Sequence, residues 1–295
     1  QHMGMAVDGL ISGLNTTRLI DQLMQAEAVP QTLLKNKVTD STTFITAMQT
    51  LNTKIASLAT AATALAKPAG TDLHTASVSS GGVASTSVTA TAGPGAVDGT
   101  IDFTVDRLAQ SQVTVTGPLT QWPDQPPTLT FVAADGTTKQ VTASSSSLAD
   151  VAAAINKAGV GVSATQVAAG LDPATGQKLY RLQLSSTQTG AAGAFTVYRG
   201  TPADVTAGTA TNLLNDPGAA QVRQAQDAQV TLWAGSSAAQ TVTSATNTFD
   251  TVLPGVSVTV SAASTTPVTL TVARDDTSIS NAANSLATSL NDIST

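Results

Sequence analysis

Cysteine is absent from this 295-residue sequence, which excludes disulfides and thiolate metal sites. Histidine is almost absent, because His2 belongs to a Gln1-His2-Met3 start typical of a cloning scar and only His74 remains. A lone histidine beside Asp72 after a long helix is expected to be an exposed loop residue. No Gly-x-Ser-x-Gly elbow accompanies it, and no group of acidic residues and histidine has zinc spacing. We therefore expect no enzyme, no metal and no cofactor.

Charge is also scarce, at 11% of residues with a net charge of −6. The sequence has no basic patch with which to bind nucleic acid and no polybasic anchor for an anionic membrane. It contains no run of 18 apolar residues, so we expect no membrane insertion. The basic-then-apolar start of a secretory signal is missing as well.

Aromatic residues make up only 3% of the chain. Trp233 falls within a strand pattern, so burial in a core or at a domain junction is at least as good an expectation as surface contact. Trp122 lies among four prolines in a stretch typical of a linker, which makes it the better candidate for contact with another molecule.

A heptad pattern of apolar residues organises the N-terminal part of the chain. Gaps of four and three alternate between Phe44 and Leu65, which predicts a helix made to pack on another helix. The same spacing returns between Ile279 and Ile293 and predicts a closing helix. The predicted packing seam consists of Phe44, Met48, Leu51, Ile55, Leu58, Leu65, Ile279, Leu286, Leu290 and Ile293. Two alternatives stay open, because the seam is explained equally well by pairing within one chain and by oligomerisation.

Residues 5–43 read as a flexible lead-in segment, followed by a helical stem formed by 44–70 and 276–295. The lead-in has capping residues at 15–17 and a helical period that Pro30 is expected to kink or break. It has no evident partner within the chain, so its apolar face is a candidate self-assembly segment. That segment comprises Leu14, Leu19, Ile20, Leu23 and Met24.

Between the helices the period changes from 3.6 to 2, which predicts strands. We expect one β-rich domain from 71–117 and 222–275, and a second, 118–221, inserted into it. The inserted domain should hold an Asp135-Gly136 hairpin and one short helix capped by Ser147. The proline cluster at 118–127 and the turn-rich stretch 201–220 read as linkers into and out of it. The predicted class is thus α+β, with a coiled-coil-like stem of terminal helices and two nested antiparallel β-rich domains.

Motifs in the right order along the chain resemble the bacterial flagellar filament cap family, also called hook-associated protein 2. The opening Val7–Asn15, with Ile20–Met24 and Glu27–Pro30, is similar to that family's start. Further matches are Phe103–Gln112, Ser147–Asn156 with Gly161–Ala164, Leu182–Gly190, Ala225–Ala228, Leu253–Val258 and Val268–Asp275. Asn15 stands where the family usually has Asp, and both residues cap helices. The family's second long helix and C-terminal segment do not follow Thr295, so a shortened chain is expected.

The resemblance implies a homo-oligomeric ring at the distal tip of the flagellum, outside the cell. It implies export through the flagellar type III apparatus, with a flagellar export chaperone and flagellin as partners. The implied function is to promote flagellin polymerisation and to retain unpolymerised subunits. The alternative from another class is a surface adhesin that binds host glycans or mucin. Such an adhesin should present aromatic platforms, and the low aromatic content weakens that alternative.

Overall fold

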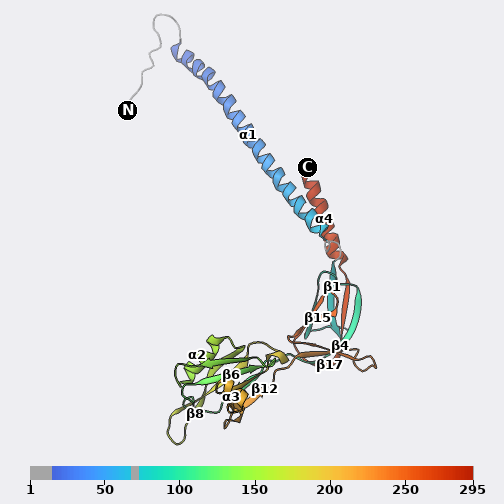
Figure 1. The fold of residues 1–295 in the computed structure, drawn as a ribbon. Coiled ribbons are helices and arrows are strands. Elements are labelled where there is room, and N and C mark those ends of the chain that lie inside the picture. Colours follow the sequence, from blue (N-terminus) through green and yellow to red (C-terminus); the bar gives the residue numbers. More distant parts are fainter. Residues whose placement is uncertain (1–14, 68–72, 295) are drawn as a thin grey trace. The chain divides into compact units, whose positions relative to one another are not determined.

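The computed structural model describes residues 15–67 and 73–294. Two compact units divide the chain, one formed by the two terminal regions up to 71 and from 276, the other by 72–275 (Figure 1). Helices occur at both ends of the chain and β-rich sheets lie between them in sequence, so the predicted fold class is confirmed.

The terminal unit is built from two helices, α1 (Thr16–Ala66) and α4 (Asp276–Ser294). Asn15 begins α1 as its N-cap, and its side-chain oxygen accepts the Arg18 N–H at 2.9 Å. Threonines within α1 satisfy their hydroxyls by donating to the carbonyl four residues earlier, as Thr50 does to Thr46 at 2.9 Å. Six threonines do this between Thr32 and Thr63, so the threonine-rich sequence is compatible with a helix.

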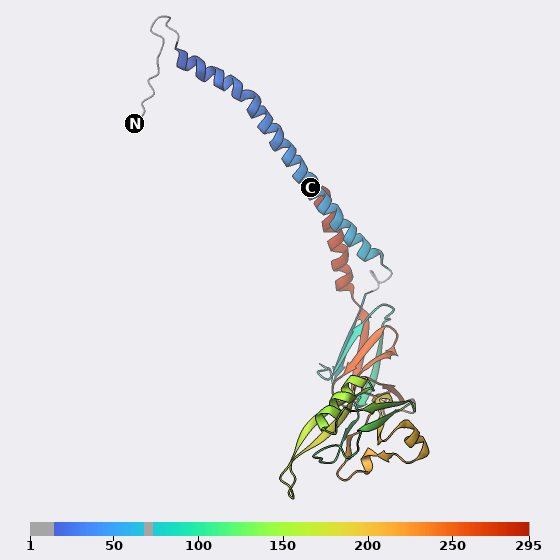
Figure 2. The same ribbon diagram turned by 60° about the vertical axis from the view of Figure 1, so that its left-hand side comes forward.

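Of the kink or break expected at Pro30, the break is wrong, because α1 continues through that residue. The helix is 51 residues long, or roughly 75 Å at the usual rise. Figure 2 shows a continuous helix that bends within its N-terminal half. Proline removes one backbone donor and crowds the preceding turn, which bends a helix without necessarily ending it. Much of the predicted lead-in is therefore part of the same helix as the predicted seam.

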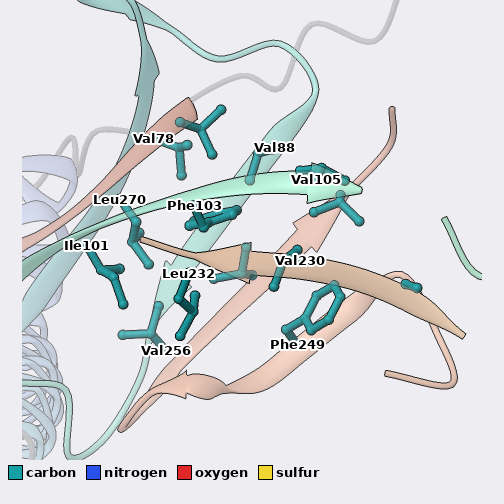
Figure 3. Close-up of a cluster of buried hydrophobic side chains, with 14 of the residues drawn as sticks. Val78, Val88, Ile101, Phe103, Val105, Val230, Leu232, Phe249, Val256 and Leu270 are labelled. Carbon is teal, nitrogen blue, oxygen red and sulfur yellow. The ribbon is translucent and has the colours of Figure 1, made fainter. Parts of the chain in front are cut away.

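The β-rich unit contains two hydrophobic cores. Around the first lie a six-stranded sheet, in the order β14-β13-β4-β17-β1-β2, and a three-stranded sheet, β15-β16-β3. Figure 3 shows Val88 and Phe249 gathered with the side chains of the larger sheet. The strands are β1 (His74–Ser80), β2 (Val83–Ala84), β3 (Val88–Ala92), β4 (Gly99–Arg107), β13 (Ala228–Leu232), β14 (Gln240–Ser244), β15 (Thr248–Leu253), β16 (Val256–Val260) and β17 (Ser264–Arg274).

The second core lies among two four-stranded sheets, β11-β10-β6-β7 and β12-β5-β9-β8, with α2 (Leu148–Ala158) packed against β8. Ser147 caps α2 by accepting the Asp150 N–H at 3.1 Å, as predicted. The strands are β5 (Val113–Val115), β6 (Thr128–Ala133), β7 (Thr138–Thr142), β8 (Val162–Leu171), β9 (Lys178–Ser186), β10 (Phe195–Arg199), β11 (Thr211–Asn212) and β12 (Ala220–Arg223).

Short elements complete this second core. The predicted Asp135-Gly136 turn joins β6 to β7, and Gly136 has the positive φ, 84°, that such a turn favours. The stretch expected to be a return linker instead contains α3 (Pro202–Ala207), β11 and the 3₁₀ turn Leu213–Asn215. A further 3₁₀ turn covers Ala191–Gly193.

Candidate assembly surface of the helical unit

In the helical unit, α1 and α4 run side by side. Between Leu51 and Leu65 of α1 and along α4, every third or fourth residue is half-buried and most residues between are exposed, whereas α1 is exposed throughout its first 35 residues, 16–50. On α1 the half-buried positions are Leu51, Lys54, Leu58, Ala61 and Leu65, and on α4 they include Ile279, Ala282, Leu286, Ser289 and Ile293. The Lys54 ammonium also donates to the Asp292 carbonyl. The two helices therefore contact each other through one stripe.

The ten predicted seam residues divide into two groups. Leu51, Leu58 and Leu65 on α1, with Ile279, Leu286 and Ile293 on α4, are half-buried. Phe44, Met48, Ile55 and Leu290 are exposed, with exposed fractions from 42% to 66%. Ile293 lines the same groove as Leu51 and Lys54, so α4 reaches that level of α1 at its C-terminal end. Phe44 and Met48 lie closer to the N-terminus than the stretch of α1 against which α4 packs.

The N-terminal part of α1 carries a long series of exposed apolar side chains. Of the predicted self-assembly residues, Leu19, Ile20, Leu23 and Met24 are about half to two-thirds exposed, and Leu14 lies outside the described residues. Ile20, Leu23, Met24 and Ala28 line a shallow groove of about 390 Å³. The series continues through Val29, Leu33, Leu34, Val38, Phe44, Ile45 and Met48. Large apolar side chains exposed in such a row are typical of an interaction surface.

The β-rich unit corrects the expectation for Trp122 and decides between the two alternatives that the sequence leaves open for Trp233. Trp122 is 1% exposed and packs in the second core, where its backbone N–H donates to the Ser146 carbonyl at 2.7 Å. The proline-rich segment around Trp122 therefore packs on the second core and is not an exposed linker. Trp233 is 45% exposed and has a φ of 49°, because it follows the last residue of β13 at the start of a turn.

His74 is also placed differently from the expectation. It is the first residue of β1, and its side chain is only 8% exposed. The Nε2 atom lies 3.3 Å from Oδ1 of Asp98. Within 15–67 and 73–294 no group of three or more acidic or histidine residues could hold a metal ion.

A polar cavity of about 340 Å³ in the second core brings Asp135 and Lys139 together with several glycines. Asp135 accepts the Thr137 N–H at 2.9 Å, and this hydrogen bond lowers the pKa of its carboxyl group. The Lys139 ammonium donates to the Gly159 carbonyl at 3.2 Å. Asp135 thus stabilises its own turn, and Lys139 links β7 to the C-terminal end of α2. In the part of the chain that is described, no helix is long and apolar enough to cross a membrane.

Two family models match this chain. One describes the N-terminus of flagellar hook-associated protein 2 and matches residues 12–112. The other describes the flagellin hook IN motif and matches residues 128–188. Together they cover the N-terminal helix, part of the first core and the α2–β8–β9 region.

Curated relatives include flagellar hook-associated protein 2 from Escherichia coli O157:H7 and from strain K12, each 30% identical over 202 residues. These alignments cover 64% of this chain and 39% or 40% of the relatives, so the chain spans about two fifths of their length.

Solved structures share the fold. The D1-D2-D3 domains of the flagellar cap protein FliD from Escherichia coli superpose with a TM-score of 0.65 at 24% identity, covering 84% of this chain and 68% of that one. FliD (HAP2) from Pseudomonas aeruginosa PAO1 gives a TM-score of 0.53 at 26% identity, covering 71% and 94% respectively.

Proposed function

Because this chain belongs to the flagellar hook-associated protein 2 family, we propose that it caps the flagellar filament as a homo-oligomer. In this role it sits at the distal tip outside the cell, promotes the polymerisation of flagellin and retains unpolymerised subunits. It reaches the tip through the flagellar type III export apparatus with the help of an export chaperone. The role is mechanical and has no catalytic step.

The exposed apolar surface of α1 is the observation that carries this proposal. Between Leu19 and Met48, α1 displays large apolar side chains that α4 does not cover. Helices of this length need a partner along their apolar face. A ring of identical chains supplies that partner through the neighbouring copies, and filament-end subunits of flagellin supply a second one.

The test compares two double variants of α1 in the intact protein. Leu23→Lys with Met24→Lys places two charges on the apolar surface, whereas Gln22→Lys with Gln25→Lys adds the same charge at neighbouring exposed polar positions. We expect the first pair to raise the protein concentration at which oligomers form at least tenfold, because each lysine must be desolvated at the contact. Light scattering coupled to size exclusion measures the oligomer, and growth of filaments from purified flagellin measures the capping function.

Two outcomes contradict the proposal. One is a wild-type protein that remains monomeric and leaves flagellin polymerisation unchanged. The other is an equal effect of both double variants, since net charge rather than the apolar surface would then explain the loss.

A further inference from the structure

The hairpin formed by β8 and β9 has one protected edge and one open edge. β9 is covered on its far side by β5 and, nearer the tip, by Leu119, which exchanges two backbone hydrogen bonds of 2.8 and 2.9 Å with Tyr180. β8 is the last strand of its sheet. Thr165 to Ala168 of β8 are all exposed, and Figures 1 and 2 show this hairpin projecting beyond the rest of its sheet.

The backbone groups of β8 alternate in direction. The Gly161 carbonyl accepts the Thr187 N–H at 3.0 Å, which places the residues paired with β9 at the odd positions. The even positions therefore direct their N–H and C=O groups away from β9, toward the open edge. Among these, Gln166 and Ala168 present their backbone groups to no other strand of the described chain.

Both ends of this open stretch are closed by local structure. At one end, the Asn156 side chain pairs with Ala164 as a neighbouring strand would, donating to its carbonyl at 2.9 Å and accepting its N–H at 2.8 Å. At the other end, the register shifts between Ala168 and Leu171, and Gly170 has a φ of 93°. The open part of this edge is therefore confined to the residues between Ala164 and Gly170.

This stretch lacks the features that normally protect an edge. From Val162 to Leu171 the sequence has no charged residue and no proline, and charges or proline are the usual means of blocking edge-to-edge pairing. Val167, at the middle of the stretch, is 42% exposed. An uncharged edge with free backbone groups and an exposed valine is suited to addition of a strand.

We propose that β8 of a second copy of this chain adds antiparallel to this edge, across a two-fold axis at Val167. Ala164 and Gly170 each lie three residues from Val167. Ala164 of one copy, whose backbone is bonded to Asn156, therefore lies opposite Gly170 of the other copy, where the register shifts. Gln166 of each copy then faces Ala168 of the other, and the two pairs exchange four backbone hydrogen bonds. The absence of charge removes any like-charge repulsion between the identical strands. This contact goes beyond the proposed function and does not depend on it, because it involves no residue of α1 or α4.

Because the chain has no cysteine, single thiols report this geometry directly. Val167 should face its own symmetry mate in a non-hydrogen-bonded pair, with Cα atoms about 4.5 Å apart, within the range of about 4.4–6.8 Å that a disulfide spans. Thr165 is also exposed and points to the same side of the strand, but its mate would be about 14 Å away, four residues along the strand. Under mild oxidation we expect disulfide-linked dimers of V167C and at least tenfold less of them for T165C.

Two double variants test the role of the backbone edge. Ala168→Pro removes the outward N–H of Ala168 without removing a hydrogen bond to β9, whereas Ala168→Val retains that N–H. We expect V167C/A168V to form dimers as V167C does and V167C/A168P to lose them, with circular dichroism showing that both remain folded. Equal dimer formation by V167C and T165C, or none by V167C at the highest soluble concentration, overturns the proposal. If V167C forms no dimer, the β8 edge does not bind a second copy, and an extended segment of a different protein becomes the alternative partner.

Discussion

Arg199 and Asp216 form a two-bond ion pair, in which Nε donates to Oδ2 and Nη2 donates to Oδ1, each at 3.0 Å. The remaining Nη1 group donates to both carboxylate oxygens of Asp124, at 2.9 and 2.8 Å. One half-buried guanidinium thereby ties the end of β10 to the proline-rich segment and to the turn after β11. Partial burial lowers the pKa of Arg199, but hydrogen bonds and attraction from the two carboxylates raise it by more than burial lowers it. The pKa of Arg199 is therefore raised overall.

We expect Arg199→Met to destabilise the second core by about 1–3 kcal/mol, because two carboxylates would lose their partner. Arg199→Lys retains the charge but cannot form the forked contacts, so its effect should be intermediate. Urea unfolding followed by Trp122 fluorescence in a Trp233→Phe background measures this core specifically. Lysine and methionine variants of equal stability would show that the ion pairs are not the source of stabilisation.

A second prediction concerns Gly190, which has a φ of 91° and lies close to Ala245 in the turn between β14 and β15. A Cβ atom there would come within 2.8 Å of both Cα and Cβ of Ala245. Thr189 donates its hydroxyl to the Ala245 carbonyl at 2.7 Å, and Asp227 accepts the Ala191 N–H at 2.7 Å, so the backbone has little freedom to move away.

Gly190→Ala should therefore cost more free energy of unfolding than Gly208→Ala. Gly208 also has a positive φ, 73°, but a Cβ there would meet nothing within 4 Å. Gly208→Ala, the control, should lower the free energy of unfolding by about 1 kcal/mol from backbone strain alone. Gly190→Ala should lower it by at least about 1 kcal/mol more, because its new Cβ also contacts Ala245. Thermal unfolding of both variants provides the comparison, and equal losses would contradict a close approach at Ala245.

How far the sequence predicts this fold depends on whether the signal is local. Ser147 and the apolar residues after it lie within one short segment, so capping and periodicity together predict α2 and its buried face. The Asp135-Gly136 turn is equally local. Arg199 illustrates the opposite case, because its partners are 75 and 17 residues away and nothing in the sequence pairs them.

The two tryptophans show why local composition can mislead. Prolines around Trp122 suggested an exposed linker, yet the Arg199–Asp124 pair and the Trp122–Ser146 hydrogen bond hold that segment over the core. Trp233 follows an alternating strand pattern, but the strand ends one residue earlier and the side chain turns outward. At Pro30, the surrounding helical residues outweigh the lost hydrogen bond, which sequence alone does not reveal.

A third prediction separates the contact between α1 and α4 from the exposed surface of α1. Leu58 is half-buried on the stripe facing α4, whereas Ile55, three residues earlier, is 48% exposed. Leu58→Ala should destabilise the helical unit by about 1–2 kcal/mol, since its partial burial keeps the loss at or below the lower limit of about 2 kcal/mol that is usual for a core leucine. Ile55→Ala should cost less than 0.5 kcal/mol, as is usual at exposed sites.

Hydrogen exchange at the amides of α4 measures this effect without requiring the whole chain to unfold. Faster exchange in Leu58→Ala but not in Ile55→Ala is the expected result. Equal protection of α4 in both variants would contradict packing through this stripe. Comparing oligomer size in the same two variants would then show whether Ile55 contributes to a contact between copies.

The last prediction follows from the cap of α3. Asp204 accepts hydrogen bonds from both the Thr201 hydroxyl, at 2.7 Å, and the Thr201 N–H, at 2.8 Å, and these bonds lower its pKa from 3.8. A carboxyl group whose pKa is lower in the folded state stabilises that state fully above its unfolded pKa and loses this contribution as the pH falls. Asp204→Asn removes the titrating group and should reduce the loss of stability between pH 5 and pH 3, roughly the range in which aspartate titrates.

Urea unfolding of both proteins across this range measures the difference, with Asp250→Asn, an exposed aspartate of β15, as the control. An identical pH dependence in wild type and Asp204→Asn would show that the capping box contributes nothing to acid stability.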